Sequence, residues 1–361
     1  MLARKHLFYT PKLDLDIGQT IAATVGYETY GQLNANRDNA VLICHDLYGT
    51  GHAAGRYHAD DPEAGWWDPL IGPGKPFDTN EYFVIASDSL CNLHVQNPLV
   101  LTTGPASLNP ATGEPYGDTF PQVTIRDLVR LQQQLVQSLG ITCLAAVAGP
   151  GMGGFQALEW AVCHPDMVKK VIAVASAPQS PPLFSLALCQ AGIDAVRQDP
   201  KGGMVQAATL MAALTRSDAY MTGAWERRTA PGSAHPWADK DGRYLFQVAI
   251  GETARKLAAS CHADHFVYTA RACMLHDIGY GNRGLDVAAQ KIRAQVLLLP
   301  IVSDVLFPPD SGAEFIDTIS QHGGTARLVP VESQGGHSAA IQECGRLAEP
   351  IAHFMSRGEL H

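Results

Sequence analysis

The chain has 361 residues, of which 46% are hydrophobic and 17% are charged, a composition typical of a large globular protein with an extensive core. Its net charge of −9 and the lack of a clustered basic stretch argue against a nucleic-acid or anionic-membrane partner. No apolar run has the length of a transmembrane helix, and the N-terminal residues lack the apolar core of a signal peptide. We therefore expect a cytoplasmic protein.

Strand-like and helix-like patterns alternate along the chain. Apolar or alternating runs predict strands at 21–30, 40–44, 82–86, 144–148, 171–175, 295–299 and 326–330. Apolar residues at helical spacing predict helices over 123–139, over 155–161, over most of 180–290, and over about 339–355.

This order of elements predicts an α/β fold with a mostly parallel sheet, helices on both faces and an inserted helical cap. The core is expected to comprise residues 1–179 and 291–361, and the cap residues 180–290. Eight cysteines are scattered without C-x-x-C pairs, and 14 histidines show no H-E-x-x-H spacing. We expect reduced thiols, no metal site and no bound cofactor.

The segment Gly149-Pro-Gly-Met-Gly-Gly154 lies between a predicted strand and a predicted helix. This is the setting in which a G-x-S-x-G elbow raises a serine hydroxyl above a sheet. Its glycines are needed because the turn is strained and packed too tightly for a Cβ. The central position is Gly151, so the sequence predicts an elbow without its nucleophile.

Two other interpretations of this segment remain open. Gly149, Gly151 and Gly154 also fit the dinucleotide fingerprint G-x-G-x-x-G. That fingerprint requires an acidic residue at the end of the next strand, where Ser176-Ala-Pro178 stand instead. The segment could also be a helix-entry turn without chemistry.

Two later residues stand where a hydrolase triad would place its acid and base. Asp304 follows the strand predicted at 295–299, and His337 follows the strand predicted at 326–330. The aspartate would orient the imidazole, which would deprotonate a hydroxyl at the elbow. Backbone N–H groups of Met152 and Leu47 are the predicted oxyanion hole. Taken singly, Asp304 could cap a loop and His337 could be a surface histidine, but their order favours a shared site.

Motifs across nearly the whole chain resemble those of the homoserine O-acetyltransferase family. They are Tyr27–Asn34, Trp67-Asp68, Ile71–Thr79, Thr103–Pro105, Asn109–Gly113, Val123–Asp127, Met152–Gly154, Gln156–Trp160 and Leu306–Pro309. The resemblance implies an α/β-hydrolase fold that moves an acetyl or succinyl group from coenzyme A to a hydroxyl through an acyl-serine. Close relatives hydrolyse simple acetate esters, and members commonly pair as homodimers through the cap.

Two positions depart from the family pattern. The family's serine falls on Gly151, and the aspartate that often follows the catalytic histidine, where it meets the homoserine amine, falls on Ser338. Ser338 is thus the predicted substrate-binding position, and it leaves the pocket without an anion for an amine. Asp264 or Asp277 could supply that charge instead.

We therefore expect an acyltransferase scaffold that is inactive or strongly impaired. Its partners would be a small-molecule acyl acceptor and a small-molecule acyl donor, with acetyl-CoA or another acyl-CoA as cosubstrate. One alternative is an esterase-like hydrolase of small acetate esters in which His337 activates water. Another is a catalytically silent homologue that binds a small molecule.

Overall fold

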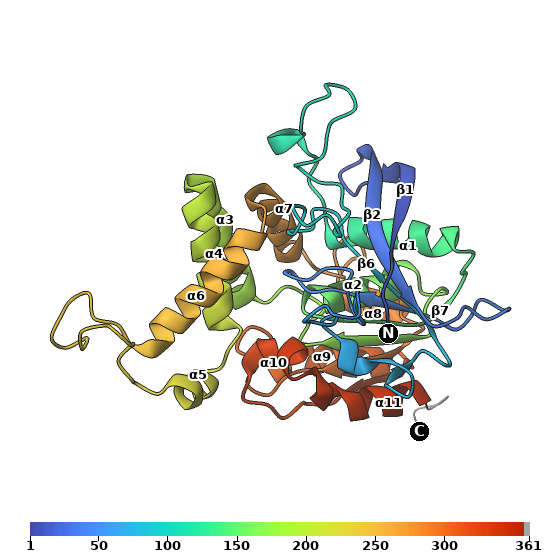
Figure 1. Cartoon of the computed structure of the whole chain (residues 1–361). Helices are drawn as coiled ribbons and strands as arrows, with labels where there is room; N and C mark the ends of the chain where they lie inside the picture. The colour runs from blue at the N-terminus through green and yellow to red at the C-terminus, as the bar shows by residue number, and fades with distance from the viewer. Residues whose placement is uncertain (357–361) are drawn as a thin grey trace.

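A computed structural model describes residues 1–356, which form an α/β architecture around one eight-stranded sheet (Figure 1). The strand order is β1-β2-β6-β3-β7-β8-β9-β10. The strands are β1 (Lys5–Asp14), β2 (Thr20–Tyr30), β3 (Ala40–Cys44), β6 (Phe83–Ser87), β7 (Leu144–Pro150), β8 (Lys170–Val174), β9 (Gln295–Leu299) and β10 (Ala326–Leu328). Strands β1, β2 and β6 pair antiparallel, and β6 onwards pair parallel. Two further short strands, β4 (Ile71–Gly72) and β5 (Phe77–Asp78), pair separately.

The central strands are apolar throughout because both faces of the sheet are covered. In β3, Val41 and Ile43 join one core cluster, while Leu42 and Cys44 join the cluster on the opposite face. This alternation follows from the two-residue period of a strand. The predicted sheet with helices on both faces is confirmed.

Eleven α-helices lie in the described chain. They are α1 (Ile125–Ser138), α2 (Met152–Cys163), α3 (Ala191–Gln198), α4 (Pro200–Leu214), α5 (Asp218–Trp225), α6 (Leu245–Ser260), α7 (Ala263–Met274), α8 (Leu285–Lys291), α9 (Ala313–Gln321), α10 (Ala339–Gln342) and α11 (Ala348–Ser356). Apolar residues of α1, α2, α8 and α9 cover one face of the sheet, and those of α11 contribute to the other face.

Helix α4 packs on both α3 and α6 beside the sheet, and α7 lies between this group and the core (Figure 1). A π-helical segment, Phe184–Gln190, leads into α3. Helix α8 falls within the predicted cap range, but its Ala288 and Ala289 pack with the core cluster that includes α2. In packing, α8 therefore belongs with the sheet.

Two predicted elements differ from the structure. The helix expected over 339–355 is divided into α10, a 3₁₀ turn at Cys344–Leu347, and α11. The division begins at Glu343, whose backbone leaves helical geometry while its carboxylate accepts a hydrogen bond from Ser333. The strand expected over 326–330 ends at Leu328. Val329 and Val331 still donate to the carbonyls of Leu298 and Pro300, but Pro300 has no N–H to donate in return, so the regular ladder stops. Strand β1 was not predicted.

Across residues 1–356, no helix combines the length and apolar character that crossing a membrane requires.

Candidate active site

The glycine-rich segment forms a sharp turn between β7 and α2. Gly151 lies at the turn with φ +51° and ψ −117°, a conformation that L side chains rarely adopt. Gly151 N–H donates to the Val174 carbonyl at 2.9 Å, which fixes the turn against the neighbouring strand. A Cβ at Gly149 would lie 2.5 Å from the Cys44 carbonyl oxygen, so only glycine fits there. The local geometry is therefore that of an elbow.

The structure brings Asp304 and His337 into direct contact. His337 Nδ1 lies 2.7 Å from Asp304 Oδ2, and both side chains are buried. The other carboxylate oxygen of Asp304 accepts the N–H groups of Leu306 and Phe307, at 2.8 and 3.1 Å. These bonds hold Asp304 in place and favour the His337 tautomer that carries its proton on Nδ1. Nε2 is then free to accept a proton.

Position 151 lies directly in front of that nitrogen. A Cβ built on Gly151 would be 3.1 Å from His337 Nε2. Burial lowers the pKa of His337, but the charge and hydrogen bond of Asp304, with a further contribution from the Asp46 charge, raise it overall. The imidazole is thus arranged as a base toward a position that carries no oxygen.

The two predicted oxyanion donors belong to Leu47, which follows Asp46, and to Met152, which follows Gly151; the Asp46 Cβ is 3.8 Å from a Cβ built on Gly151. Leu47 lies in the loop after β3, and Met152 is the first residue of α2; both are buried. N–H groups in the first turn of a helix have no intrahelical acceptor. Within residues 1–356, the backbone N–H groups of Leu47 and Met152 have no hydrogen-bond partner, so both are free to donate.

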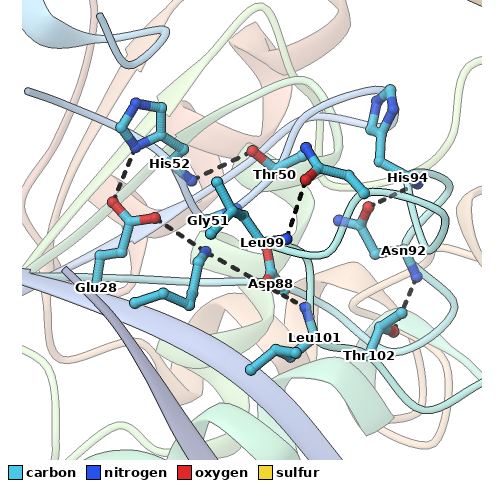
Figure 2. A network of polar contacts seen from close by, with 12 residues as sticks. Glu28, Thr50, Gly51, His52, Asp88, Asn92, His94, Leu99, Leu101 and Thr102 are labelled. Carbon is cyan, nitrogen blue, oxygen red and sulfur yellow. Dashed lines mark hydrogen bonds and ion pairs between the residues drawn. The ribbon is translucent and has the colours of Figure 1, made fainter. Parts of the chain in front are cut away.

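A buried polar network, which sequence reasoning did not identify, supports the loop that carries Leu47 (Figure 2). Asp88 accepts the N–H of Gly51 at 2.7 Å and that of Leu101 at 3.1 Å. Lys5 connects Asp88 to Glu28, at 3.4 and 2.9 Å. The loop is therefore tied to β2 and β6 through buried charges.

Glu28 is fully buried, and each of its oxygens has partners. His52, Tyr30 and Tyr57 lie within 3.0, 2.6 and 2.5 Å of its carboxylate. Burial raises the pKa of Glu28, but these hydrogen bonds and the Lys5 charge outweigh it and lower the pKa to about 2. The Tyr27–Asn34 motif contains Glu28, but nothing in that motif indicates partners elsewhere in the chain.

The other end of the loop is held by side chains after β6. Asn92 donates to the Gly49 carbonyl at 3.0 Å and to His45 Nε2 at 3.2 Å. His94 Nε2 contacts the Tyr48 carbonyl at 2.8 Å. Burial lowers the pKa of His45 to about 4, so this imidazole is neutral near pH 7. Together these contacts fix the backbone on either side of Leu47.

A cavity of about 310 Å³ opens beside His337. It is lined by Asp46, Tyr48, Pro150, Met211, Ala212, Thr215, Arg216, Thr253, Leu257, His337, Ser338, Ala340, Ile341 and Gln342. Residues of α4 and α6 close it from the cap side, so core and insertion form it together. Ser338 lines this cavity, and its hydroxyl donates to the Gly335 carbonyl at 2.8 Å.

The cavity contains a carboxylate, although the sequence led us to expect none at Ser338. It is that of Asp46, which sequence reasoning passed over even though it stands between His45 and Leu47. Asp264 and Asp277 line two other cavities. Neither of the carboxylates considered from the sequence lies in the lining of the His337 cavity.

Cysteine and metal chemistry add no further candidate. All eight cysteines are free thiols, and burial raises the pKa of most of them, which keeps those thiols protonated near pH 7. In the described part of the chain, no group of three His, Cys, Asp or Glu side chains is arranged to hold a metal ion.

Comparison with known proteins identifies the fold and the family. A family model described as alpha/beta hydrolase fold matches residues 39–343. Homoserine O-acetyltransferase of Carboxydothermus hydrogenoformans is 36% identical over 96% of this chain and 93% of its own. The crystal structure of homoserine O-acetyltransferase from Bacillus anthracis superposes with a TM-score of 0.95 at 36% identity, covering 99% of this chain and 98% of that one.

The crystal structure of esterase E22 is also similar, with a TM-score of 0.91 at 32% identity, covering 98% of this chain and all of that one. Transferases and an esterase thus share this architecture, and their likeness extends over the elbow, the insertion and the loops that carry Asp304 and His337. The sequence resemblance is confirmed: the chain belongs to the homoserine O-acetyltransferase family of α/β hydrolases.

Proposed function

We propose that this chain is a homoserine O-acetyltransferase-like scaffold that forms no acyl-enzyme at its elbow and is therefore inactive or strongly impaired in acyl transfer. One observation carries the proposal: His337 Nε2 faces position 151 at 3.1 Å from a Cβ that glycine does not have. Covalent catalysis requires a nucleophilic atom within hydrogen-bond reach of its base.

The cavity beside His337 is the proposed ligand site. Its volume of about 310 Å³ suits a small acyl acceptor, and acetyl-CoA or another acyl-CoA is the proposed donor. Leu47 and Met152 would donate to the acyl oxygen of a bound ester or thioester. Such a site can hold and polarise an acyl group without attacking it.

A second candidate is slow hydrolysis of small acetate esters. Here His337, oriented by Asp304, would take a proton from water as the water attacks the carbonyl carbon. The similarity to esterase E22 favours this candidate. In serine proteases, removal of the triad leaves about 10³–10⁴-fold catalysis over water, which comes from the oxyanion donors and from binding.

Intact-protein mass spectrometry after incubation with acetyl-CoA, and separately with p-nitrophenyl acetate, tests the main proposal. We expect no acetylated protein; a stable acetyl group on any serine would contradict it. Ester turnover by the same preparation, lost in His337→Ala, would establish the second candidate. Turnover that is unchanged in His337→Ala would exclude it, and no turnover above the buffer rate would leave a binding function.

We also propose that the chain forms a homodimer through its helical insertion. Leu186 and Trp237 lie on this insertion and are 65% and 87% exposed, which is unusual for large apolar side chains. Multi-angle light scattering should give twice the chain mass, and Leu186→Glu should yield monomers. A monomeric wild-type chain would refute this proposal.

A further inference from the structure

A second cavity, of about 470 Å³, lies between α1, α2 and the segment that follows α7, and is called the α1–α2 cavity below. None of the residues that line it also lines the His337 cavity. One of them, His276, stacks on Phe155 with ring centroids 4.0 Å apart. Phe155 in turn contacts Phe307, and Phe307 packs on His337. Aromatic rings therefore stand between the α1–α2 cavity and the elbow.

Two buried residues that line the α1–α2 cavity each carry an acceptor atom without a partner. Glu159 is 3% exposed; its Oε1 pairs with Arg126 at 2.8 Å, but its Oε2 meets no donor among residues 1–356. His276 is 4% exposed, and its Nε2 lies 3.3 Å from the Ala177 carbonyl, which can only accept. Nε2 therefore carries the proton, and Nδ1 is an acceptor that also has no partner in this part of the chain. Buried polar atoms are nearly always hydrogen-bonded, so these two require an explanation.

The charges around the α1–α2 cavity leave it negative. Asp16, Glu159 and Asp277 line it, whereas Arg126 is the one Lys or Arg among the described residues of its lining. Arg126 is shared between Glu159 and Asp16, at 2.8 and 3.6 Å, and Arg130 pairs with Asp16 from outside the lining. Asp277 forms no ion pair within residues 1–356. Burial raises the pKa of Glu159 to about 7 although the Arg126 charge opposes it, so this carboxylate gains free energy from a further cation.

Other residues of the same lining are apolar and exposed. Ile17, Leu275 and Tyr280 all line the α1–α2 cavity and are 44%, 43% and 73% exposed. Single apolar side chains on a surface are ordinary, but apolar side chains that gather around a cavity are typical of a binding site. An apolar surface combined with a few polar atoms is the usual composition of a small-molecule site.

We propose that the α1–α2 cavity is a second ligand site, which binds a small organic cation on Glu159 and His276. The cationic head is an ammonium, amidinium or guanidinium group, and the apolar body of the ligand packs on Ile17, Leu275 and Tyr280. Such a head donates several hydrogen bonds, which Oε2 and Nδ1 accept, and it supplies the positive charge that the carboxylates lack. The inference is independent of the proposed function, because the two cavities share no lining residue.

Other occupants of the α1–α2 cavity fit less well. The N-terminus of α1 would attract an anion, but the Asp127 carboxylate already lies there, in a capping box with Thr124. An anion would also be repelled by Glu159 and Asp277. A metal ion lacks ligands, since no group of three His, Cys, Asp or Glu side chains within residues 1–356 is arranged to hold one. A neutral molecule would supply no positive charge.

The test compares benzamidinium with benzamide, which has a neutral amide oxygen in place of one charged NH₂ group. Isothermal titration of the wild-type chain above the pKa of Glu159 should show benzamidinium binding about ten- to a hundredfold more tightly, the range of a hydrogen bond to a charged group. Glu159→Gln should remove this preference by weakening benzamidinium alone. Asp46→Asn, which makes the same change in the His337 cavity, is the matched control and should keep the preference.

Leu275→Lys is a second variant, which leaves the pair between Arg126 and Glu159 intact. Its added cation at the cavity should reduce the preference for benzamidinium by about two- to fivefold, the size of an exposed charge–charge effect. Leu108→Lys places the same charge on an exposed leucine outside the lining of this cavity and should leave the preference unchanged.

Three results would overturn the inference: equal affinity for the two probes in the wild-type chain, no binding of either probe, or a preference that Glu159→Gln leaves intact. A preference that is lost in Asp46→Asn would place the cation in the His337 cavity and would overturn it as well. Thermal unfolding verifies that Glu159→Gln is folded. If it is not, the comparison of Leu275→Lys with Leu108→Lys decides, and equal preference in those two variants would contradict the inference.

Discussion

Two carboxylates, Glu28 of β2 and Asp46 of the loop after β3, have opposite surroundings. Glu28 is fully buried and contacts Lys5, two tyrosine hydroxyls and His52. Asp46 is half-buried, lines a cavity and forms no ion pair within the described chain. Their pKa values follow: that of Glu28 is lowered to about 2, and that of Asp46 is raised. Polar groups whose partners all lie within the protein stabilise the scaffold, whereas polar groups that lack such partners mark where a ligand is expected.

The same contrast separates the two regions as wholes. The network around Glu28 and Asp88 satisfies its charges internally and holds the loop after β3 at Gly51 (Figure 2). The elbow region instead has Asp46, an imidazole nitrogen without a hydroxyl, and two N–H groups that have no acceptor among residues 1–356. Substitutions in the first region should change stability, and those in the second should change chemistry.

The largest expected effect is gain of function at the elbow. Gly151→Ser places a hydroxyl within reach of His337 Nε2, so hydrolysis of p-nitrophenyl acetate should rise by about 10³-fold or more. The positive φ strains any side chain there, so unfolding free energy should fall by about 1–3 kcal/mol. Stopped-flow turnover and urea denaturation measure the two effects, with Gly151→Ala as the control that has the strain without the hydroxyl.

Substitution in the network around Glu28 and Asp88 should instead change mainly the stability of the fold. Glu28→Gln leaves the largely buried Lys5 with only the longer contact to Asp88, and we expect a loss of about 3 kcal/mol in unfolding free energy. Asp46→Asn is the matched comparison and should change stability by less than about 1 kcal/mol. Urea denaturation measures the unfolding free energy of both variants. Equal losses in Glu28→Gln and Asp46→Asn would show that the two regions do not differ in their contribution to stability.

Lowering the pH should reduce the stability that Glu28 contributes to the fold. A lowered pKa stabilises the fold above the unfolded-state value, and this contribution is lost as pH falls through the folded-state value. For Glu28 the window runs from 4.5 down to about 2. Unfolding free energy of the wild-type chain should fall through this window more steeply than that of Glu28→Gln. Parallel curves would show that Glu28 is not the titrating group.

The smallest effect concerns His337. Burial lowers its pKa, while Asp304 and, to a lesser extent, Asp46 raise it. The pKa measured from the imidazole proton resonances should therefore drop in Asp304→Asn and drop by a smaller amount in Asp46→Asn. An unchanged value in Asp46→Asn would mean that the two groups do not interact across the elbow.

Sequence reasoning succeeded where a feature is local. The apolar strands, the glycine turn at Gly151 and the order of Asp304 and His337 are each visible within a few residues, and family motifs connected them into one fold. The structure then placed His337 against Asp304 and opposite Gly151.

Sequence reasoning failed where the partners of a contact lie far apart along the chain. Lys5 and Asp88 are 83 positions apart, and neither has a local pattern that predicts the contact. Strand β1 has many exposed residues and a bulge between Thr10 and Leu13, which obscures its alternation. Asp46 was overlooked because a carboxylate in a loop is ordinarily solvated, and only the packed cap shows that it faces a cavity.

Labelling with a fluorophosphonate probe is the most direct test of the central claim, that the elbow lacks only its nucleophile. The wild-type chain, Gly151→Ser, and Gly151→Ser combined with His337→Ala would be treated side by side, and the labelled residue located by peptide mass spectrometry. We predict no label on the wild type, rapid labelling of residue 151 in Gly151→Ser, and strongly slowed labelling in the double variant. A label on the wild-type chain at any serine, or a folded Gly151→Ser chain that stays unlabelled, would contradict the account.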